Sequence, residues 1–487
     1  MKRLINITYW RLGHLLPKAY STDFYYLKVA QRLYDVIRFT PFGRDGGDYL
    51  SMEMAFTLAY YLEDVISDFG LWRSFVTRHK KLYGKYLPFY DTDEEEYFPD
   101  EIHYDDVRFL IWMIKQKDLE DTFFNPENPY LNETATAVYR IMDGLFEKVP
   151  INNELATDLA DPELYEEFFL AREMCNFMAK SYLLEPFRME KEDDIEESLE
   201  NFLSQLDEKA HAYNVDCLLT INKKNGPLAL HTYEYLSDIL AHQGQKEAAE
   251  WVSGIEGCPY NIYRVKTYDN HSVTVENIEG EEFILLRNSF ERMSDSTLQS
   301  NRYLISALVK YRGKWHPNGI SSWMDHPEFF EEEKERRANL STELNQRMKA
   351  ANQGHRMLYF ADYTEMEAWL AKHIGLHKDF QATEEMKKLQ YPAIFIPEKG
   401  NLQIISRGAR IIKDERNPYY DLTEANSEGI NFIINPDIVS DEVLHFLIDH
   451  RMLPDACINS TKEPDRGRQL VQENIDFIAR FMRPSNY

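Results

Sequence analysis

The stretch IYRVKTYDNHSVTVENIEGEEFILLRN, residues 262–288, marks the point where the pattern of apolar side chains changes. Apolar and polar residues alternate within it, and turn-forming residues at 269–271 and 279–281 divide it into short segments. Alternation of this kind, interrupted by turn residues, is typical of antiparallel strands. The stretch therefore predicts a β-meander just after the middle of the chain.

The β-pattern continues beyond this stretch. In RYLISALVKYRG, residues 302–313, the side chains of Ile305, Ala307, Val309 and Tyr311 fall on one face. Pro317-Asn318-Gly319 follows and has the chemistry of a turn before ISSW. Residues 259–323 together predict a small antiparallel, barrel-like module of the SH3 or OB size class.

The chain before this module has the spacing of helices. Apolar residues recur every three or four positions in DFYYLKVAQRLYDVIR (23–38) and YLSMEMAFTLAYYLEDVISDFG (49–70). Residues 228–252 predict a helical hairpin that turns near Gln243-Gly244. Two acidic stretches interrupt the pattern: residues 91–106 are expected to be a solvated loop, and residues 189–209 a surface helix.

The chain after the module mixes both patterns. A charged helix is expected over 326–352, with Glu332/Arg336 and Glu333/Arg337 spaced to form ion pairs. The segments MLYFA, AIFIP, NLQIISRG and INFIIN (430–435) predict strands, and helices are expected near 365–374, 441–451 and 466–482. We therefore predict an α+β protein with four parts: a helical domain 1–255 with a break near 185–210, a barrel-like module 256–325, a spacer helix 326–354 and an α+β domain 355–487.

The charge of the chain limits the classes of partner. Lys and Arg number 55 against 82 Asp and Glu, which gives a formal net charge of -27. Such a field repels phosphate backbones, so nucleic-acid binding by the whole chain is disfavoured, although a local basic patch could override it. No apolar run is long enough to cross a bilayer, and no membrane contact is expected.

The cysteines and the N-terminus indicate the compartment. Cys175, Cys217, Cys258 and Cys457 lie far apart, without the paired spacing of a zinc site or the density of a disulfide scaffold. The first residues lack an uninterrupted apolar region and a cleavage site of small residues, so they do not predict a signal peptide. We expect a cytoplasmic protein with reduced thiols.

One segment of the barrel-like module is a candidate binding site. Lys310, Arg312, Lys314, Trp315 and His316 form a basic and aromatic edge in an acidic protein. Small barrels bind extended peptides or single-stranded nucleic acid through such edges. The structural alternative is that Trp315 packs inside while the cations are solvated, or that they contact the chain's own acidic stretches.

Two other patterns are weaker candidates. The segment FGRDGGDYL, residues 42–50, could hold an anion through Arg44, Gly46 and Gly47. The start of a helix, with Asp48 near its cap, explains the segment better, because the Lys-Ser/Thr of a P-loop is absent.

The motif Glu-x-x-His occurs at Glu208/His211 and at Glu442/His445, as in metal-binding helical bundles. A chain rich in Glu contains such pairs by chance, and Ser440 as a helix cap would explain Glu442. No metal and no cofactor is therefore predicted.

Several segments resemble a known group of proteins. They are HYDDVRFLIWMIKQ (103–116), FNPENPYLNETATAVYRIMDGLF (124–146), FLIDHRMLPDACINS (446–460) and GRQLVQENIDFIARFMRP (467–484). These segments are similar to uncharacterised soluble proteins of Bacteroidetes-type bacteria. The resemblance implies a bacterial, cytosolic origin and brings no activity or functional residue with it.

The sequence thus leads to a non-enzymatic interaction or regulatory protein that binds a protein partner through the barrel edge. One alternative is a metal-dependent hydrolase whose Asp, Glu and His meet only in the folded chain. Another is single-stranded nucleic-acid binding by the basic and aromatic edge. The oligomeric state is left open by the sequence.

Overall fold

The computed structural model describes residues 5–92, 95–119, 122–188, 208–290, 298, 302–325, 330–331, 334, 342–375, 383–458 and 464–484. They form two compact units, the first mainly from Met1–Glu120 and Pro126–Phe330 and the second mainly from Glu331–Arg483. Helices and sheets are both present, so the predicted α+β class is confirmed. The finer division into four parts stays a prediction. No helix in these ranges is long and apolar enough to cross a membrane.

The helical part of the first unit comprises α1 to α12. Its helices are α1 (Ile7–Leu12), α2 (Asp23–Ile37), α3 (Pro41–Ser67), α4 (Leu71–Tyr83), α5 (Tyr104–Asp118), α6 (Pro129–Asp143), α7 (Asn153–Leu159), α8 (Phe168–Ala179), α10 (Glu208–Ile221), α11 (Thr232–His242) and α12 (Lys246–Ser253). Short 3-10 turns are η1 (Phe146–Lys148), η2 (Pro162–Tyr165) and η3 (Glu185–Phe187), and β1 (Lys224–Asn225) pairs with β2 (Leu230–His231). The predicted hairpin is α11–α12, with Gly244 at positive φ between them.

Two buried aspartates fix the junction of α3, α4 and α5. Asp64 of α3 accepts hydrogen bonds from the backbone N–H groups of Gly70, Leu71 and Trp72, at 2.7–3.2 Å. Gly70, which precedes α4, has no side chain to cap that helix, so Asp64 supplies the cap from a neighbouring helix.

Asp106 of α5 holds the other end of the same tryptophan. It accepts from the indole N–H of Trp72 at 3.0 Å and from the hydroxyls of Tyr61 and Tyr97 at 2.6 and 2.8 Å. Burial raises the pKa of Asp106 to about 7, although these three donors favour the ionised form. Trp72 therefore joins two desolvated carboxyl groups by its backbone and its ring.

The strands of the first unit close into a small barrel in the order β3-β4-β5-β7-β6. They are β3 (Glu256–Tyr268), β4 (Ser272–Glu276), β5 (Glu282–Leu286), β6 (Tyr303–Tyr311) and β7 (Lys314–Met324), with η5 (Arg287–Ser289) after β5. Antiparallel pairs make up the sheet except for β5 and β7, which meet in parallel at Leu285 and Trp315. The predicted β-meander thus forms one wall of a closed sheet.

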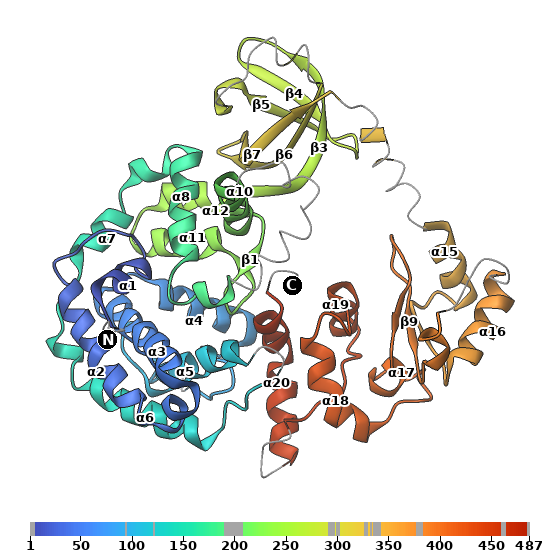
Figure 1. The fold of residues 1–487 in the computed structure, drawn as a ribbon, viewed down its shortest axis with the longest axis horizontal. Helices are drawn as coiled ribbons and strands as arrows, with labels where there is room; N and C mark the ends of the chain where they lie inside the picture. Colours follow the sequence, from blue (N-terminus) through green and yellow to red (C-terminus); the bar gives the residue numbers. More distant parts are fainter. Residues whose placement is uncertain are drawn as a thin grey trace. The chain divides into compact units, whose positions relative to one another are not determined.

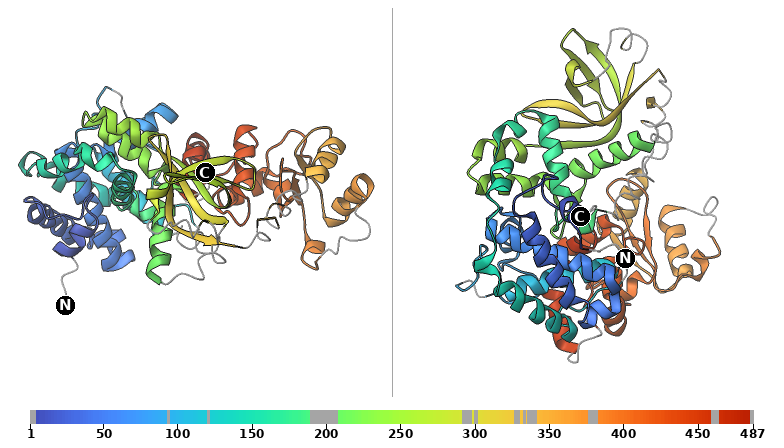
Figure 2. Two further views of the ribbon diagram at one scale, coloured as in Figure 1. Left: turned by 90° about the horizontal axis from the view of Figure 1, so that it is seen from above. Right: turned by 60° about the vertical axis from the view of Figure 1, so that its left-hand side comes forward.

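Strand β6 is buried on both faces. Leu304 and Leu308 point into the barrel core, which also contains Val273, Val275 and Leu285. On the outer face, Ala307 packs against Val215, Leu218 and Leu219 of α10. The barrel lies next to α8 and α10 in Figure 1 and in the right-hand view of Figure 2. Of the residues predicted to share one face, Ala307 and Tyr311 contact the helical part, whereas Ile305 packs with Ile262, Ile278, Tyr303 and Phe330.

The predicted turn at Pro317-Asn318-Gly319 is wrong. The chain reverses at Arg312 and Gly313, whose φ values of 48° and 76° match the positive pair that a tight hairpin turn needs. Residues 317–319 lie inside β7, where the register with β6 shifts and forms a bulge.

The bulge docks on α10. Asn214 of α10 accepts a hydrogen bond from the N–H of Ile320 at 2.8 Å, and Asn318 donates to the Cys217 carbonyl at 2.9 Å. Turn chemistry and bulge chemistry both favour Gly at positive φ, which explains the error.

The second unit contains a three-stranded antiparallel sheet in the order β10-β9-β8. Its elements are α15 (Thr342–Ala351), β8 (Met357–Tyr359), α16 (Tyr363–Ile374), η6 (Met386–Lys388), β9 (Ala393–Phe395), β10 (Gln403–Ile405), α17 (Gly408–Ile411), α18 (Leu422–Ile434), α19 (Asp441–Asp449) and α20 (Pro464–Met482). Leu358, Phe360, Met366 and Ile394 are part of its core. The predicted strands at MLYFA, AIFIP and NLQIISRG are confirmed.

The predicted strand INFIIN is wrong, because residues 430–434 belong to α18. Asp421 caps that helix by accepting from the N–H groups of Thr423 and Glu424. The helix therefore starts well before the apolar run, which by itself fits a strand or a buried helix. The pairs Glu332/Arg336 and Glu333/Arg337, and most of the acidic stretch 189–209, lie outside the described residues.

We predict that Gly319→Ala destabilises the protein far more than Gly313→Ala. Both glycines have positive φ, which costs another residue about 1–2 kcal/mol. A Cβ at Gly319 would also lie 2.1 Å from Oδ1 of Asn214, whereas nothing lies within 4 Å at Gly313. Denaturant unfolding should show a loss of about 3 kcal/mol or more at 319, since the hydrogen bond to Asn214 is lost as well. Equal losses would contradict the docked bulge.

We also predict that Asp106 makes stability depend on pH. Its pKa is raised in the folded protein, from 3.8 to about 7, so its contribution is fully present below pH 3.8 and is lost as the pH rises from there to about 7. The wild type should lose about 4 kcal/mol relative to Asp106→Asn across that window. Unfolding measured from pH 4 to 8 tests this, with Asp437→Asn, at an exposed position, as the control. An Asp106→Asn profile parallel to that of the wild type would refute it.

Candidate functional site

Two cations of the predicted barrel edge are bound within the chain. The guanidinium of Arg312 lies 3.8 Å from the centre of the Trp251 ring and donates to the Glu166 carbonyl at 2.8 Å. The ammonium of Lys310 pairs with the carboxylate of Glu256 at 3.1 Å. Both side chains therefore already have partners on or beside the barrel, and Arg312 holds the β6–β7 turn against the helices.

The aromatic members of the edge are also packed. Trp315 meets Phe283 edge-to-face, with 4.9 Å between ring centres, and belongs to the barrel interior. His316 stacks on Phe168 of α8 at 5.0 Å, and burial lowers its pKa, so the imidazole is neutral at pH 7. Arg312 and Lys314 are the exposed members of the five, and of these two only Lys314 lacks a side-chain hydrogen bond, ion pair or ring contact among the residues that the structure describes.

The glycine-rich stretch 42–50 is not a loop. Pro41 begins α3 after the cap Thr40, and the non-helical Gly47, at φ 71°, forms a kink that divides α3 into two helical segments. The N–H of Arg44 is bonded to the Thr40 carbonyl inside the first turn. Anion binding stays a prediction, now confined to the exposed Arg44 side chain and the surroundings of Gly46 and Gly47.

The two Glu-x-x-His pairs lie on α10 and α19, in different units. Ser440 caps α19 as expected, and Glu442 pairs with Arg356 at 2.9 Å. Within the described ranges, no group of three or more His, Cys, Asp or Glu is placed to hold a metal ion. Metal binding by Glu208, His211, Glu442 or His445 stays a weak prediction.

A hollow of about 330 Å³ lies between α8 and α10, beside the barrel edge. Phe169, Leu170 and Tyr213 at this hollow are 43, 41 and 46 % exposed. The guanidinium of Arg172 lies 5.3 Å from the ring centres of both Phe169 and Tyr213 and donates to the Tyr213 hydroxyl. Its Nη1 is buried and has no hydrogen-bond partner among the described residues.

This α8–α10 hollow adjoins the predicted edge through one contact. Phe169 meets the ring of His316 at 6.3 Å, edge-to-face. We call the residues around this contact the barrel–α8 surface: the exposed Lys314, Phe169, Leu170 and Tyr213 and the partly buried His316 and Arg172. It combines one end of the predicted site with residues that no motif had indicated.

A larger hollow of about 960 Å³ shares Leu170 and Glu173 with the first. Its lining comes from the segment before α2, from α7 and η2, from α8 and from the α11–α12 turn: Leu16, Pro17, Lys18, Asn153, Ala156, Thr157, Asp158, Ala160, Asp161, Pro162, Leu164, Leu170, Glu173, Met174, Phe177, Gln243 and Gln245. We call it the α7–α8 groove.

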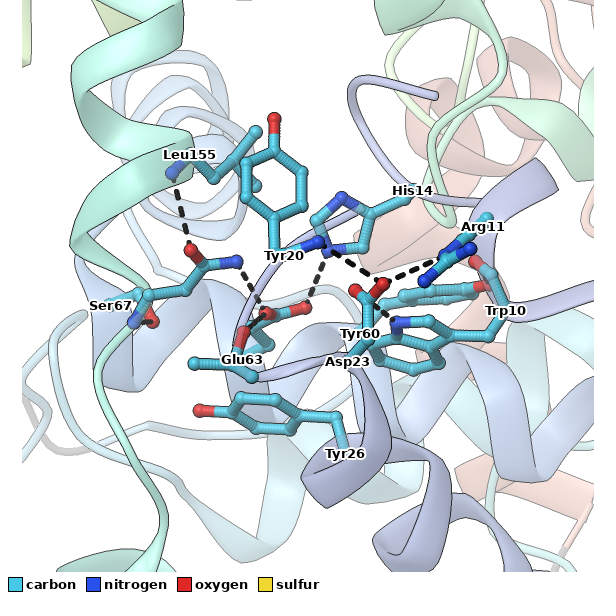
Figure 3. A network of polar contacts seen from close by, with 12 residues as sticks. Trp10, Arg11, His14, Tyr20, Asp23, Tyr26, Tyr60, Glu63, Ser67 and Leu155 are labelled. Carbon is cyan, nitrogen blue, oxygen red and sulfur yellow. Dashed lines mark hydrogen bonds and ion pairs between the residues drawn. The ribbon is translucent and has the colours of Figure 1, made fainter. Parts of the chain in front are cut away.

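One buried carboxylate holds two segments of the groove wall. Glu63 of α3 contacts His14 Nε2 at 2.8 Å, and its other oxygen accepts from the Asn152 side-chain amide at 2.9 Å. Asn152 in turn caps α7 by accepting from the N–H of Leu155. Figure 3 shows the His14 ring facing the Glu63 carboxylate, with Leu155 nearby. Glu63 thereby fixes the segment that leads to Leu16 and the start of α7.

Two further carboxylates complete this network. Asp23 accepts from the Trp10 indole at 3.2 Å and from Arg11 Nε at 2.9 Å, and Figure 3 shows this cluster beside Tyr60. Asp158 of α7 accepts from Lys18 at 2.8 Å and from the Tyr20 hydroxyl at 3.1 Å. The segment between α1 and α2 is therefore bonded directly to α7 through Lys18 and Tyr20, and indirectly to the cap of α7 through His14 and Glu63.

Sequence reasoning missed both hollows. His14, Glu63 and Asn152 lie far apart in the chain, and no short motif joins them. A signal existed at α8, where Phe168-Phe169-Leu170-Ala171 places four apolar residues in succession. A helix that buries one face cannot bury four successive residues, so some of them had to be exposed.

Comparison with known proteins gives a family without an assigned activity. No curated protein and no solved structure matches the chain. The family described as Protein of unknown function (DUF3843) matches residues 9–275 and 319–483, which include the whole α7–α8 groove. Residues 276–318, with β5, β6 and all five residues of the predicted barrel edge, fall outside the match. A match over most of the chain means that the protein belongs to the DUF3843 family.

Proposed function

We propose that this chain is a non-enzymatic interaction protein and that it binds another protein through the barrel–α8 surface. The observation that carries the proposal is the cluster of half-exposed Phe169, Leu170 and Tyr213 around a guanidinium that retains an unused donor. Aromatic and Arg side chains dominate the binding energy of protein interfaces. As in the sequence-based hypothesis, the partner is a protein. The contact surface proposed for it is now the junction between the barrel and α8, not the barrel edge alone.

The chemistry of this surface indicates which kind of partner segment would bind to it. Arg172 Nη1 calls for a carboxylate or carbonyl oxygen, because a buried donor without a partner costs about 1–3 kcal/mol. Phe169 and Leu170 favour an apolar side chain beside that oxygen. A partner segment with an acidic and an apolar or aromatic residue next to each other meets both demands.

The alternatives from sequence have less support. The hydrolase alternative requires carboxyl groups with raised pKa in an open hollow. Asp64 and Asp106 are instead buried, and they accept hydrogen bonds from the backbone and the indole of Trp72. Nucleic-acid binding requires free cations, and Arg312 and Lys310 are engaged within the chain. All four cysteines are unpaired, which supports the inference that the protein works in a reducing compartment such as the cytoplasm.

We predict that a photo-crosslinking phenylalanine analogue at position 169 captures a protein partner in cells that make this chain. The same analogue at position 98 is the matched control, because Phe98 is 50 % exposed and lies away from this surface in sequence. The adduct should be specific to position 169 and should disappear with Arg172→Glu, which reverses the charge that the partner contacts. Adducts are identified by mass spectrometry.

Three outcomes would overturn the proposal. They are the absence of a protein adduct at 169, the same adducts at 169 and 98, and an adduct made of nucleic acid. Metal analysis of the purified full chain tests the hydrolase alternative, since stoichiometric zinc, iron or manganese would favour it over a binder.

A further inference from the structure

The α7–α8 groove has an apolar floor and a negative rim. Leu16, Leu164, Leu170, Met174 and Phe177 supply apolar surface. Asp158, Asp161 and Glu173 supply carboxylates, and the one cation in the lining, Lys18, is already paired with Asp158 at 2.8 Å. Two rim carboxylates therefore have no cation in the groove, and a ligand with positive charges would complement them.

The walls of the groove are fixed before any ligand binds. Glu63, 1 % exposed, bonds both His14 and Asn152 and so holds the segment of Leu16 and the start of α7. Lys18 and Tyr20 add two bonds to Asp158 on α7. A preformed site loses little conformational entropy when it binds, and this increases the affinity for a given contact area.

The size and form of the groove favour a peptide segment. Its volume of about 960 Å³ lies at the upper end for small-molecule pockets, and it is open to solvent. Grooves between helices accept amphipathic helices, whose apolar side chains recur every three or four residues. Lys or Arg on the flanks of such a helix would lie near Asp161 and Glu173.

We propose that the α7–α8 groove binds a basic amphipathic helix of a protein partner. The apolar stripe of the helix packs on the floor between α7 and α8, and its cations pair with the rim carboxylates. This site lies beside the barrel–α8 surface and shares Leu170 with it, and Leu170 and Glu173 border both hollows. It does not depend on the function proposed above.

The test uses the full chain and labelled helical peptides of about 18 residues, long enough to hold a helix. One peptide has a Leu stripe with Lys on the other positions, one has the same composition in scrambled order, and one has Glu in place of Lys. Fluorescence anisotropy should show saturable binding of the Leu/Lys stripe peptide only. Equal binding of the scrambled or the Glu peptide would overturn the proposal, and so would displacement of the stripe peptide by spermine alone.

Two variants locate the binding. Asp161→Asn/Glu173→Gln removes two rim charges and should weaken binding at least about threefold, since each exposed pair contributes modestly. Glu133→Gln/Glu147→Gln removes the same charge at exposed positions outside the groove and should leave binding unchanged, which controls for general attraction to an acidic protein.

Ala156→Trp should abolish binding by filling the groove without a change of charge. Unchanged binding by Ala156→Trp, or equal weakening by both charge variants, would refute the site. The capture at position 169 should persist in Ala156→Trp, so a failure here differs from a failure of the proposed function.

Discussion

The first unit depends on one strand that is buried on both sides. β6 places Leu304 and Leu308 in the barrel core and Ala307 against α10, so it belongs to two cores at once. Its neighbour β7 adds the bulge at Gly319, which brings Asn318 and Ile320 within hydrogen-bonding distance of α10. The barrel therefore cannot be separated from the helices without exposing an apolar face. This constraint explains why the basic and aromatic edge has its Arg and His packed on helical side chains.

The helical part is held by buried acids. Trp72 connects Asp64 and Asp106, and Glu63 connects His14 and Asn152. Each carboxyl group is desolvated at a cost, and each satisfies several donors that would otherwise be unpaired. Glu63 and Asp64 are adjacent in α3, so one turn of a central helix organises both the groove wall and the start of α4. Glu63 stabilises the wall of the α7–α8 groove, and all three acids are buried.

The sequence predicted local structure well where one period dominated. Alternation over 262–288 indicated β3 to β5, and the spacing in 228–252 indicated α11 and α12. It failed where one local pattern fits two structures, as at Pro317-Asn318-Gly319 and at INFIIN. Of the candidate site, the sequence named Lys314 and His316, which remain at the barrel–α8 surface. The apolar run at 168–171 indicates only that some side chain of α8 is exposed. Arg172, Tyr213 and the Glu63 network were beyond reach, because tertiary packing decides which distant side chains meet.

Native-state hydrogen exchange, read by mass spectrometry at low denaturant concentrations, tests most directly whether barrel and helices form one cooperative body. The backbone amides of β6 and of α10 should exchange with the same free energy of opening, because the face they share is lost only when both open. A separate, lower-energy opening that exposes β6 while α8 and α10 stay protected would contradict this account. The barrel would then be an independent module, and its edge would be free to bind a partner.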